Sequence, residues 1–263
     1  MSDFIGTDVF VALQKSLHAR QSEFACNSII SNGGRIMNVL DPEVFGWDKL
    51  RQTAEEDLLV GITMVDRDTT LAKLSKLFGN DAEFPYWQVF TGASGTVLPR
   101  CEALLTAQPL PDGWTLQSFT HPSEGIIAQS QNLNIETDVA PYPGYYLQGE
   151  VMPSMLTCIF DETGKMIVCA SGNMRYHADS PFAKWMFAGG VSVHPSQRRR
   201  GLGSYVSAAL LRDSHASFGW TTVLEQAKAD NLPSVGMITK CGLTAVLNKV
   251  TIVVNLTGGY VTR

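Results

Sequence analysis

The chain has 263 residues, of which 44% are apolar, and a net charge of −5 at pH 7. This is enough apolar material for one large domain or two small ones, and the acidic balance argues against a general nucleic-acid-binding protein. No stretch approaches the ~20 apolar residues that cross a membrane, and the first residues lack the parts of a signal peptide. We therefore expect a cytoplasmic protein with no membrane partner. The five scattered cysteines lack metal-ligand spacing, so no metal site is predicted.

Apolar periodicity predicts several elements in the first hundred residues. They are a helix at 8–30, a short strand at 35–40, a helix at 47–59, a strand at 61–65, a helix from Asp68 to Gly79, and an aromatic segment at 84–90 that is either a strand or a pocket wall. Trp47, Trp87 and Trp114 are interpreted as core residues, with a substrate cage as the alternative. The stretch 108–113, which contains proline and glycine, is the candidate domain boundary.

Beyond that boundary the pattern predicts a strand at 114–119, a helix at 123–132 and a hairpin of strands 155–160 and 165–173. The segment 140–146 contains two prolines and a glycine and is expected to be a loop. Its three tyrosines are predicted to be exposed or to line a pocket. The loop is either a substrate lid or an ordinary surface loop.

A buried strand at 185–193, interrupted by Gly189-Gly190, leads into the turn from His194 to Gly203. The predicted helix 204–217 follows, and Gly219 caps it. The free N–H groups at a helix start, together with three arginines in the turn, form an anion site. A strand at 221–226, a helix capped by Asn231 and a final strand or kinked pair at 245–256 complete the chain.

Two motifs in this region resemble the GCN5-related N-acetyltransferase (GNAT) superfamily. Arg198-x-x-Gly201-x-Gly203 resembles its acyl-CoA pyrophosphate loop, and Asn231, Ser234 and Cys241-Gly242-Leu243 resemble its Asn-x-x-Ala…Gly-Phe helix. The resemblance covers about the last 150 residues. It implies an α/β (α+β) fold with a mixed central sheet flanked by helices. Residues 111–263 would form the acetyltransferase domain. Residues 1–110 would form an α/β or mostly helical region, with a degenerate GNAT-like domain without its own cofactor loop as one form of it.

The resemblance also implies acetyl-CoA as co-substrate and no metal. The bulged strand would offer backbone groups to pantetheine and to the thioester oxygen, and the turn would hold the phosphates. The implied binding residues are Val191, Ser192, Val193, Arg198, Arg199, Arg200, Gly201, Leu202, Gly203, Ser204 and Asn231.

The catalytic acid and base are less clearly marked. Many relatives place a glutamate on the strand before the turn, but 184–193 contains no acid. Glu225, within a predicted strand, is a candidate general base, with a buried structural carboxylate as the alternative. His177 and Asp179 are further candidates. The usual general acid, a tyrosine seven residues after the capping asparagine, is replaced by Ile238.

We therefore predict an N-acetyltransferase that moves an acetyl group from acetyl-CoA directly to a primary amine of a small molecule or amino acid. The alternatives are transfer of a longer acyl group, or an acyl-CoA-binding sensor without catalysis. The sequence does not indicate the oligomeric state.

Overall fold

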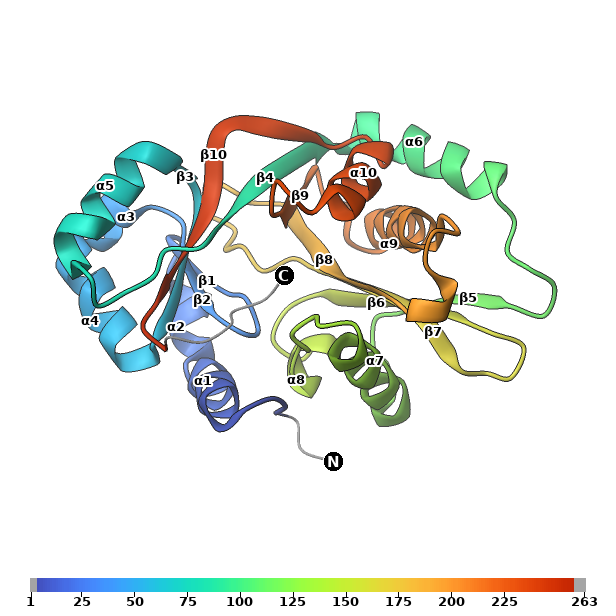
Figure 1. Cartoon of the computed structure of the whole chain (residues 1–263), viewed down its shortest axis with the longest axis horizontal. Helices are drawn as coiled ribbons and strands as arrows, with labels where there is room; N and C mark the ends of the chain where they lie inside the picture. Colours follow the sequence, from blue (N-terminus) through green and yellow to red (C-terminus); the bar gives the residue numbers. More distant parts are fainter. Residues whose placement is uncertain (1–3, 258–263) are drawn as a thin grey trace.

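The computed structural model describes residues 4–257, which share one mixed sheet flanked by helices (Figure 1). The strand order is β1-β2-β3-β10-β4-β9-β8-β7-β6-β5. The strands are β1 (Ile30–Asn32), β2 (Met37–Val39), β3 (Leu59–Asp66), β4 (Tyr86–Ala93), β5 (Thr115–Phe119), β6 (Ser154–Phe160), β7 (Met166–Asn173), β8 (Trp185–Val193), β9 (Thr222–Ala227) and β10 (Thr244–Asn255).

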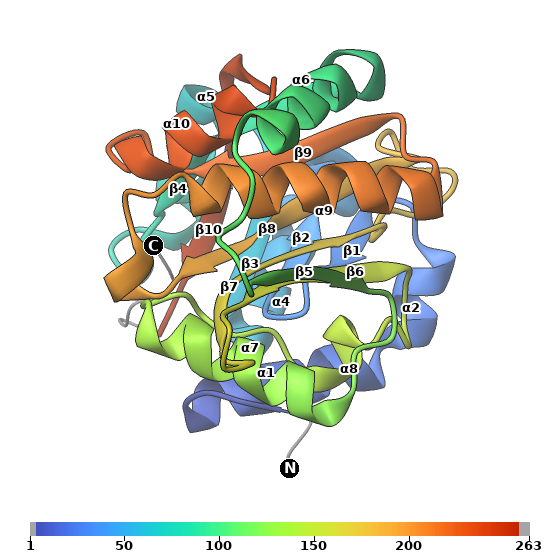
Figure 2. The ribbon, with the colours of Figure 1, turned by 90° about the vertical axis from the view of Figure 1, so that its right-hand side faces the viewer.

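Helices cover both faces of this sheet (Figure 2). They are α1 (Asp8–Ala19), α2 (Gln21–Cys26), α3 (Pro42–Phe45), α4 (Trp47–Asp57), α5 (Arg67–Phe78), α6 (Ser94–Ala107), α7 (Glu124–Glu136), α8 (Gly144–Leu147), α9 (Leu202–Phe218) and α10 (Leu232–Lys240). In Figure 2, α9, α6 and α10 lie on one side of the sheet, and α7, α8 and α1 lie on the other. Within residues 4–257, no helix is long and apolar enough to cross a membrane.

The sheet has a palindromic topology centred on β10 and β4. Outward from this antiparallel pair, β3 matches β9 and β2 matches β8. The β2–β3 and β8–β9 pairs are both parallel, while the β3–β10 and β9–β4 pairs are both antiparallel. The parallel strands are connected by α3 and α4 in the N-terminal half and by α9 in the C-terminal half. One further helix, α5 or α10, then leads to the central strand. The N-terminal half is therefore an α/β unit that repeats the layout of the C-terminal half.

The central strands are exchanged between the halves. β10 comes from the C-terminal half but lies between β3 and β4, and β4 from the N-terminal half lies between β10 and β9. Helix α6 also crosses over, since its Val97 and Cys101 belong to the core cluster that contains α9. Strands from both sides of the loop at 108–113 therefore belong to one continuous sheet. The division into domains at 110/111 stays a proposal.

Burial explains why the C-terminal strands form where they do. Every residue of β6 and β7 is buried, which matches their nearly continuous apolar sequences. In the turn between them, the Asp161 carboxylate accepts hydrogen bonds from the backbone N–H groups of Thr163 and Lys165. The hairpin predicted here is confirmed.

Three predicted elements need correction. The helix 8–30 is wrong as a single helix, because α1 ends at Ala19, α2 ends at Cys26 and Ile30 pairs in β1. Asp66 rather than Asp68 caps α5, accepting a hydrogen bond from the Thr69 N–H at 3.0 Å. The segment 140–146 is not wholly a loop, since one helical turn, α8, begins directly after Pro143.

The three tyrosines of that segment are buried rather than exposed, and Tyr142 lines the cavity described below. Tyr145 contacts the rings of Phe4 and His18, which belong to the N-terminal part of the chain. Of the three tryptophans, Trp87 is 2% exposed and belongs to the core, whereas Trp47 and Trp114 pack against two different core clusters from partly exposed positions. The core interpretation therefore holds for them better than a shared cage.

Candidate active site

The site begins where two parallel strands separate. β8 pairs with β9 only through residues 185–187 and 222–224. Beyond Phe187 and Leu224 the strands diverge, so the edge of β8 from Ala188 to Val193 has no strand partner on that side. Unpaired backbone N–H and C=O groups along such an edge are available to a bound ligand.

A β-bulge shapes this free edge. Between the pairs Cys169–Ser192 and Ser171–Gly189, β8 carries one more residue than β7. Gly190 has a φ of +63°, and a Cβ there would lie 2.9 Å from Cε2 of Tyr142. Tyr142 and Phe187 are thus the aromatic neighbours of the Gly189-Gly190 pair, and only glycine fits at position 190.

The turn after β8 presents N–H groups at the end of this opening. Gly201, with a φ of +75°, precedes α9, and the first intrahelical bond of α9 runs from the Tyr205 N–H to the Gly201 carbonyl. The N–H groups of Leu202, Gly203 and Ser204 therefore precede the first closed turn. No acidic side chain occupies the first turn of α9, and the helix dipole adds positive potential there.

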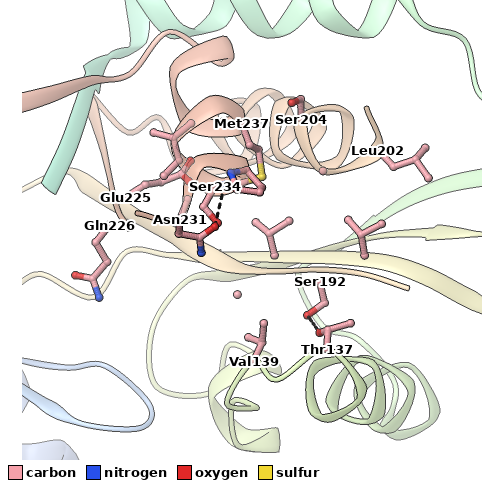
Figure 3. A pocket seen from close by; sticks show the side chains of 18 of the residues that line it. Thr137, Val139, Ser192, Leu202, Ser204, Glu225, Gln226, Asn231, Ser234 and Met237 are labelled. Carbon is pink, nitrogen blue, oxygen red and sulfur yellow. Dashed lines mark hydrogen bonds between the residues drawn. The ribbon is translucent and has the colours of Figure 1, made fainter. Parts of the chain in front are cut away.

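A cavity of about 580 Å³ is lined by the free edge of β8, by the turn after it and by Arg35 and Trp87 of the N-terminal half. Figure 3 labels ten of its residues, with Glu225 and Gln226 on β9 and Leu202 at the start of α9. The predicted site residues that line it are Val191, Ser192, Val193, Arg198, Arg199, Gly201, Leu202, Gly203, Ser204, Glu225 and Asn231.

Three predicted site residues do not line this cavity. The Arg200 guanidinium bonds to the Gln197 side chain and lies 5.1 Å from the centroid of the Trp114 ring. His177 Nδ1 accepts a hydrogen bond from the Asp179 backbone N–H at 3.1 Å, and both residues lie in the loop between β7 and β8. Because they lie outside the cavity, His177 and Asp179 have no part in the reaction proposed below.

Glu225 is the first residue of β9 beyond the segment that pairs with β8. It lines the cavity, although its side chain is only 3% exposed. Desolvation raises the pKa of its carboxyl to about 8. A carboxyl with such a pKa is mostly protonated at neutral pH and can exchange a proton there, as a general base does.

The next residue, Gln226, also lines the cavity (Figure 3). Its Oε1 is buried and has no hydrogen-bond partner among residues 4–257. An unsatisfied buried acceptor costs free energy that a bound donor would recover. Gln226 is not among the residues predicted from the sequence, because a polar residue in a short strand carries no signal of its own.

The motif that begins at Asn231 also lines the cavity. The Asn231 side chain caps α10 by accepting a hydrogen bond from the Ser234 N–H at 3.3 Å (Figure 3). Ile238 is buried and lines the cavity, so no hydroxyl stands at that position. The hydrogen-bonding contact with Cys101, together with burial, holds the pKa of the Cys241 thiol far above its usual value, so Cys241 stays a neutral core residue.

Other lining residues come from distant segments that no motif marks. Thr137 and Val139 follow the end of α7, and the Thr137 hydroxyl bonds to the Ser192 hydroxyl at 2.8 Å (Figure 3). Tyr142 precedes α8, while Arg35 and Trp87 belong to the N-terminal half. Both halves thus contribute to one cavity, because the shared sheet brings these distant segments together.

Known proteins with a similar sequence or fold include acetyltransferases of the GNAT type. Residues 128–243 match the family model described as "Acetyltransferase (GNAT) family". The C-terminal half of the chain carries a GNAT domain. The matched segment spans the bulged strand, the turn and α10. The family model leaves the N-terminal half unassigned. No curated protein sequence matches the chain.

Solved structures extend the similarity in fold to most of the chain. A GCN5-related N-acetyltransferase from Kribbella flavida superposes with a TM-score of 0.60 at 14% identity, covering 95% of this chain and 98% of that one. A GCN5-related N-acetyltransferase-like protein from Streptococcus suis gives 0.56 at 12% identity, covering 92% and 98%. A tandem GNAT protein from the clavulanic acid biosynthesis pathway gives 0.53 at 14% identity, covering 87% and 78%. The fold is a GNAT fold with a GNAT-like N-terminal half.

Proposed function

We propose that the protein transfers the acetyl group of acetyl-CoA directly to a primary amine of a small molecule or amino acid. The observation that carries this proposal is the continuity of one cavity from the anion-binding turn, past the free edge of β8, to Glu225. Phosphates would bind at one end, the acyl group along β8 and the amine near β9.

The residues present fit acetyl-CoA. Arg198 and Arg199 line the cavity beside the first turn of α9, where backbone N–H groups and two guanidinium groups would hold the phosphates. The exposed edge of β8 would pair with the amide groups of pantetheine and hold the thioester oxygen. Acetyl-CoA supplies the acyl group as a thioester whose C–S bond breaks as the C–N bond forms.

Glu225 would remove a proton from the acceptor nitrogen, directly or through a water molecule. An ordinary amine of pKa ~10.4 is almost wholly protonated at neutral pH and must lose that proton before it can attack. A carboxylate with a pKa near 8 is better matched to this task than an ordinary one. With Ile238 at the usual tyrosine position, the departing thiolate would take its proton from solvent.

The five cysteines are all free thiols, and four of them are buried. Free thiols are typical of a reducing compartment, which supports a cytoplasmic location as part of this proposal.

The first test is calorimetric titration of the purified protein with acetyl-CoA, with longer acyl-CoAs and NAD for comparison. A thiol-release assay with a panel of primary amines follows. We expect acetyl-CoA to bind most tightly and at least one amine to release thiol. A preference for a longer chain would favour a different acyl transferase, and binding without release would favour a sensor. Absence of acyl-CoA binding would refute the proposal.

A further inference from the structure

Arg35 reaches the cavity from the N-terminal half, at the tip of the turn between β1 and β2. The turn is tightly fixed: the Asn32 side chain accepts a hydrogen bond from the Gly34 N–H at 2.7 Å, and the Gly33 N–H donates to the Ile36 carbonyl at 2.9 Å. Gly34 has a φ of +74°, and a Cβ there would lie 2.9 Å from the Tyr146 ring. The turn is therefore seated against the C-terminal half, which sets the position of Arg35.

The Arg35 guanidinium is oriented by neutral groups only. Nη1 donates to the Ala140 carbonyl at 2.5 Å, Nη2 donates to the Tyr142 hydroxyl at 2.9 Å, and the guanidinium carbon lies 4.0 Å from the centroid of the Tyr142 ring. None of the ion pairs within residues 4–257 involves Arg35. Since a guanidinium has five N–H donors, three remain beyond these two bonds.

The position of Tyr142 places the Arg35 charge near the bulge of β8, the strand along which the acyl group would lie. The same ring that carries Arg35 lies against Gly190, at the bulge of β8. Gly190 precedes Val193, the last residue of β8, by roughly 10 Å of extended strand, and the turn with Arg198 lies beyond Val193. Arg35 is thus separated from the phosphate-binding end and belongs to the part of the cavity left for the acceptor.

Two further polar groups lie at or behind the wall of this part of the cavity. Arg175, 9% exposed, lies with its guanidinium carbon 3.6 Å from the centroid of the Phe187 ring, which lines the cavity, and it too is absent from the ion pairs of residues 4–257. This second guanidinium adds positive potential behind the wall. The unpartnered Gln226 Oε1 offers an acceptor to an amine N–H.

We propose that the acceptor is an amine that also carries a carboxylate, an amino acid, and that Arg35 binds the carboxylate. The inference rests on the proposed function, whose reaction it narrows to one acceptor class. A planar guanidinium with free N–H groups matches a carboxylate in a bidentate pair. Arg35 is therefore a specificity residue supplied by the N-terminal half.

The test compares free L-amino acids with primary amines of the same carbon skeleton that lack the carboxylate, in the thiol-release assay with acetyl-CoA. We expect the wild-type protein to prefer the amino acids. Arg35→Ala should raise KM for the best amino acid by roughly 10- to 100-fold, the usual effect of losing a charge-assisted pair. It should leave kcat with the matched amine and the Kd of acetyl-CoA unchanged, and Arg35→Lys should lie between.

Arg51→Ala is the matched control, because Arg51 is an exposed arginine of α4 paired with Glu55 and lies outside the cavity. Melting temperatures of Arg35→Ala and Arg35→Lys check that the turn still folds. A second readout, titration of the CoA-saturated protein with the same amino acids, needs no turnover.

Three results would overturn the inference: a wild-type preference for amines without a carboxylate, an equal loss with all amines in Arg35→Ala, or weaker acetyl-CoA binding in that variant. Failure of the proposed function looks different, since then no amine releases thiol from the wild-type protein. In that case the titration still decides: amino-acid binding that Arg35→Ala abolishes supports the role of Arg35, and absence of such binding refutes it.

Discussion

The turn after β8 and the turn after β2 occupy matching positions in the palindromic sheet, yet only one is suited to bind an anion. After β8, the chain presents Arg198, Arg199 and the first N–H groups of α9 to the cavity. After β2, the Asp41 carboxylate accepts hydrogen bonds from the N–H groups of Glu43 at 3.0 Å and Val44 at 3.1 Å. The N-terminal turn thus satisfies its helix start with its own side chain.

The two turns show that topology alone does not make a binding site. A helix N-terminus attracts anions only while its N–H groups are free, and an internal carboxylate removes that possibility. A second difference lies on the neighbouring strand: Glu225 follows the last β8–β9 pair, whereas Thr63 follows the last β2–β3 pair and bonds to Asn38 at 3.3 Å. The N-terminal half has kept the framework but not the reactive groups.

The largest expected effect comes from giving the β8 turn the character of the β2 turn. Arg198→Ala with Gly203→Asp removes a guanidinium and places a carboxylate in the first turn of α9. Because like charges brought together cost several kcal/mol, we expect acetyl-CoA affinity to fall ~1000-fold or more in calorimetric titration. An aspartate in the first helical turn favours the helix, so the variant should fold. Unchanged affinity would refute the assignment of the turn, and Arg51→Ala serves as the control.

Glu225→Gln tests the second difference between the halves. If Glu225 is the general base, kcat should fall roughly 10²- to 10⁴-fold, while the Kd of acetyl-CoA stays the same. The wild-type kcat/KM should rise with pH and level off above about 8, because the carboxyl must lose its proton to act. Thr63→Ser, at the matching position of the N-terminal half, should retain full activity. A Glu225→Gln enzyme with wild-type kcat would assign the carboxyl a structural role.

The same variant should change stability with a definite pH dependence. The folded pKa of Glu225, about 8, lies above its ordinary value of 4.5. The cost of keeping this carboxyl un-ionised in the folded state is therefore absent below pH 4.5 and grows up to pH 8. Glu225→Gln should therefore raise the free energy of unfolding by a few kcal/mol at pH 8.5 and leave it nearly unchanged at pH 4. Urea denaturation at both pH values measures this difference. Equal effects at the two pH values would contradict it.

The smallest effect is expected in the N-terminal turn. Asp41→Ala removes the cap of α3 and should lower the free energy of unfolding by about 1 kcal/mol. Acetyl-CoA affinity should not change, because Asp41 does not line the cavity. Asp41→Asn, which keeps a capping oxygen, should recover most of the stability. A loss of acetyl-CoA affinity in Asp41→Ala would mean that the N-terminal turn also takes part in binding.

Local sequence predicted most of the C-terminal elements. Strand β8, helix α9 with its Gly219 cap, and α10 capped by Asn231 all form where apolar spacing and capping residues place them. Helix α6 was missed, because Gly95 and Pro99 obscure its pattern. Its stability comes from packing of Val97 and Cys101 into the core beside α9, and local propensity does not report such contacts.

The glycine-rich turn after β8, the bulged strand before it and Glu225 as a candidate could all be read from the sequence, because each depends on residues that are neighbours along the chain. The sequence did not reveal that β10 lies between β3 and β4, or that Arg35, Trp87 and Tyr142 share one cavity with Glu225. Periodicity indicates which face of an element is buried but not which element covers it. Arg35 and Tyr142 are 107 residues apart, and the sheet that joins the two halves brings them together.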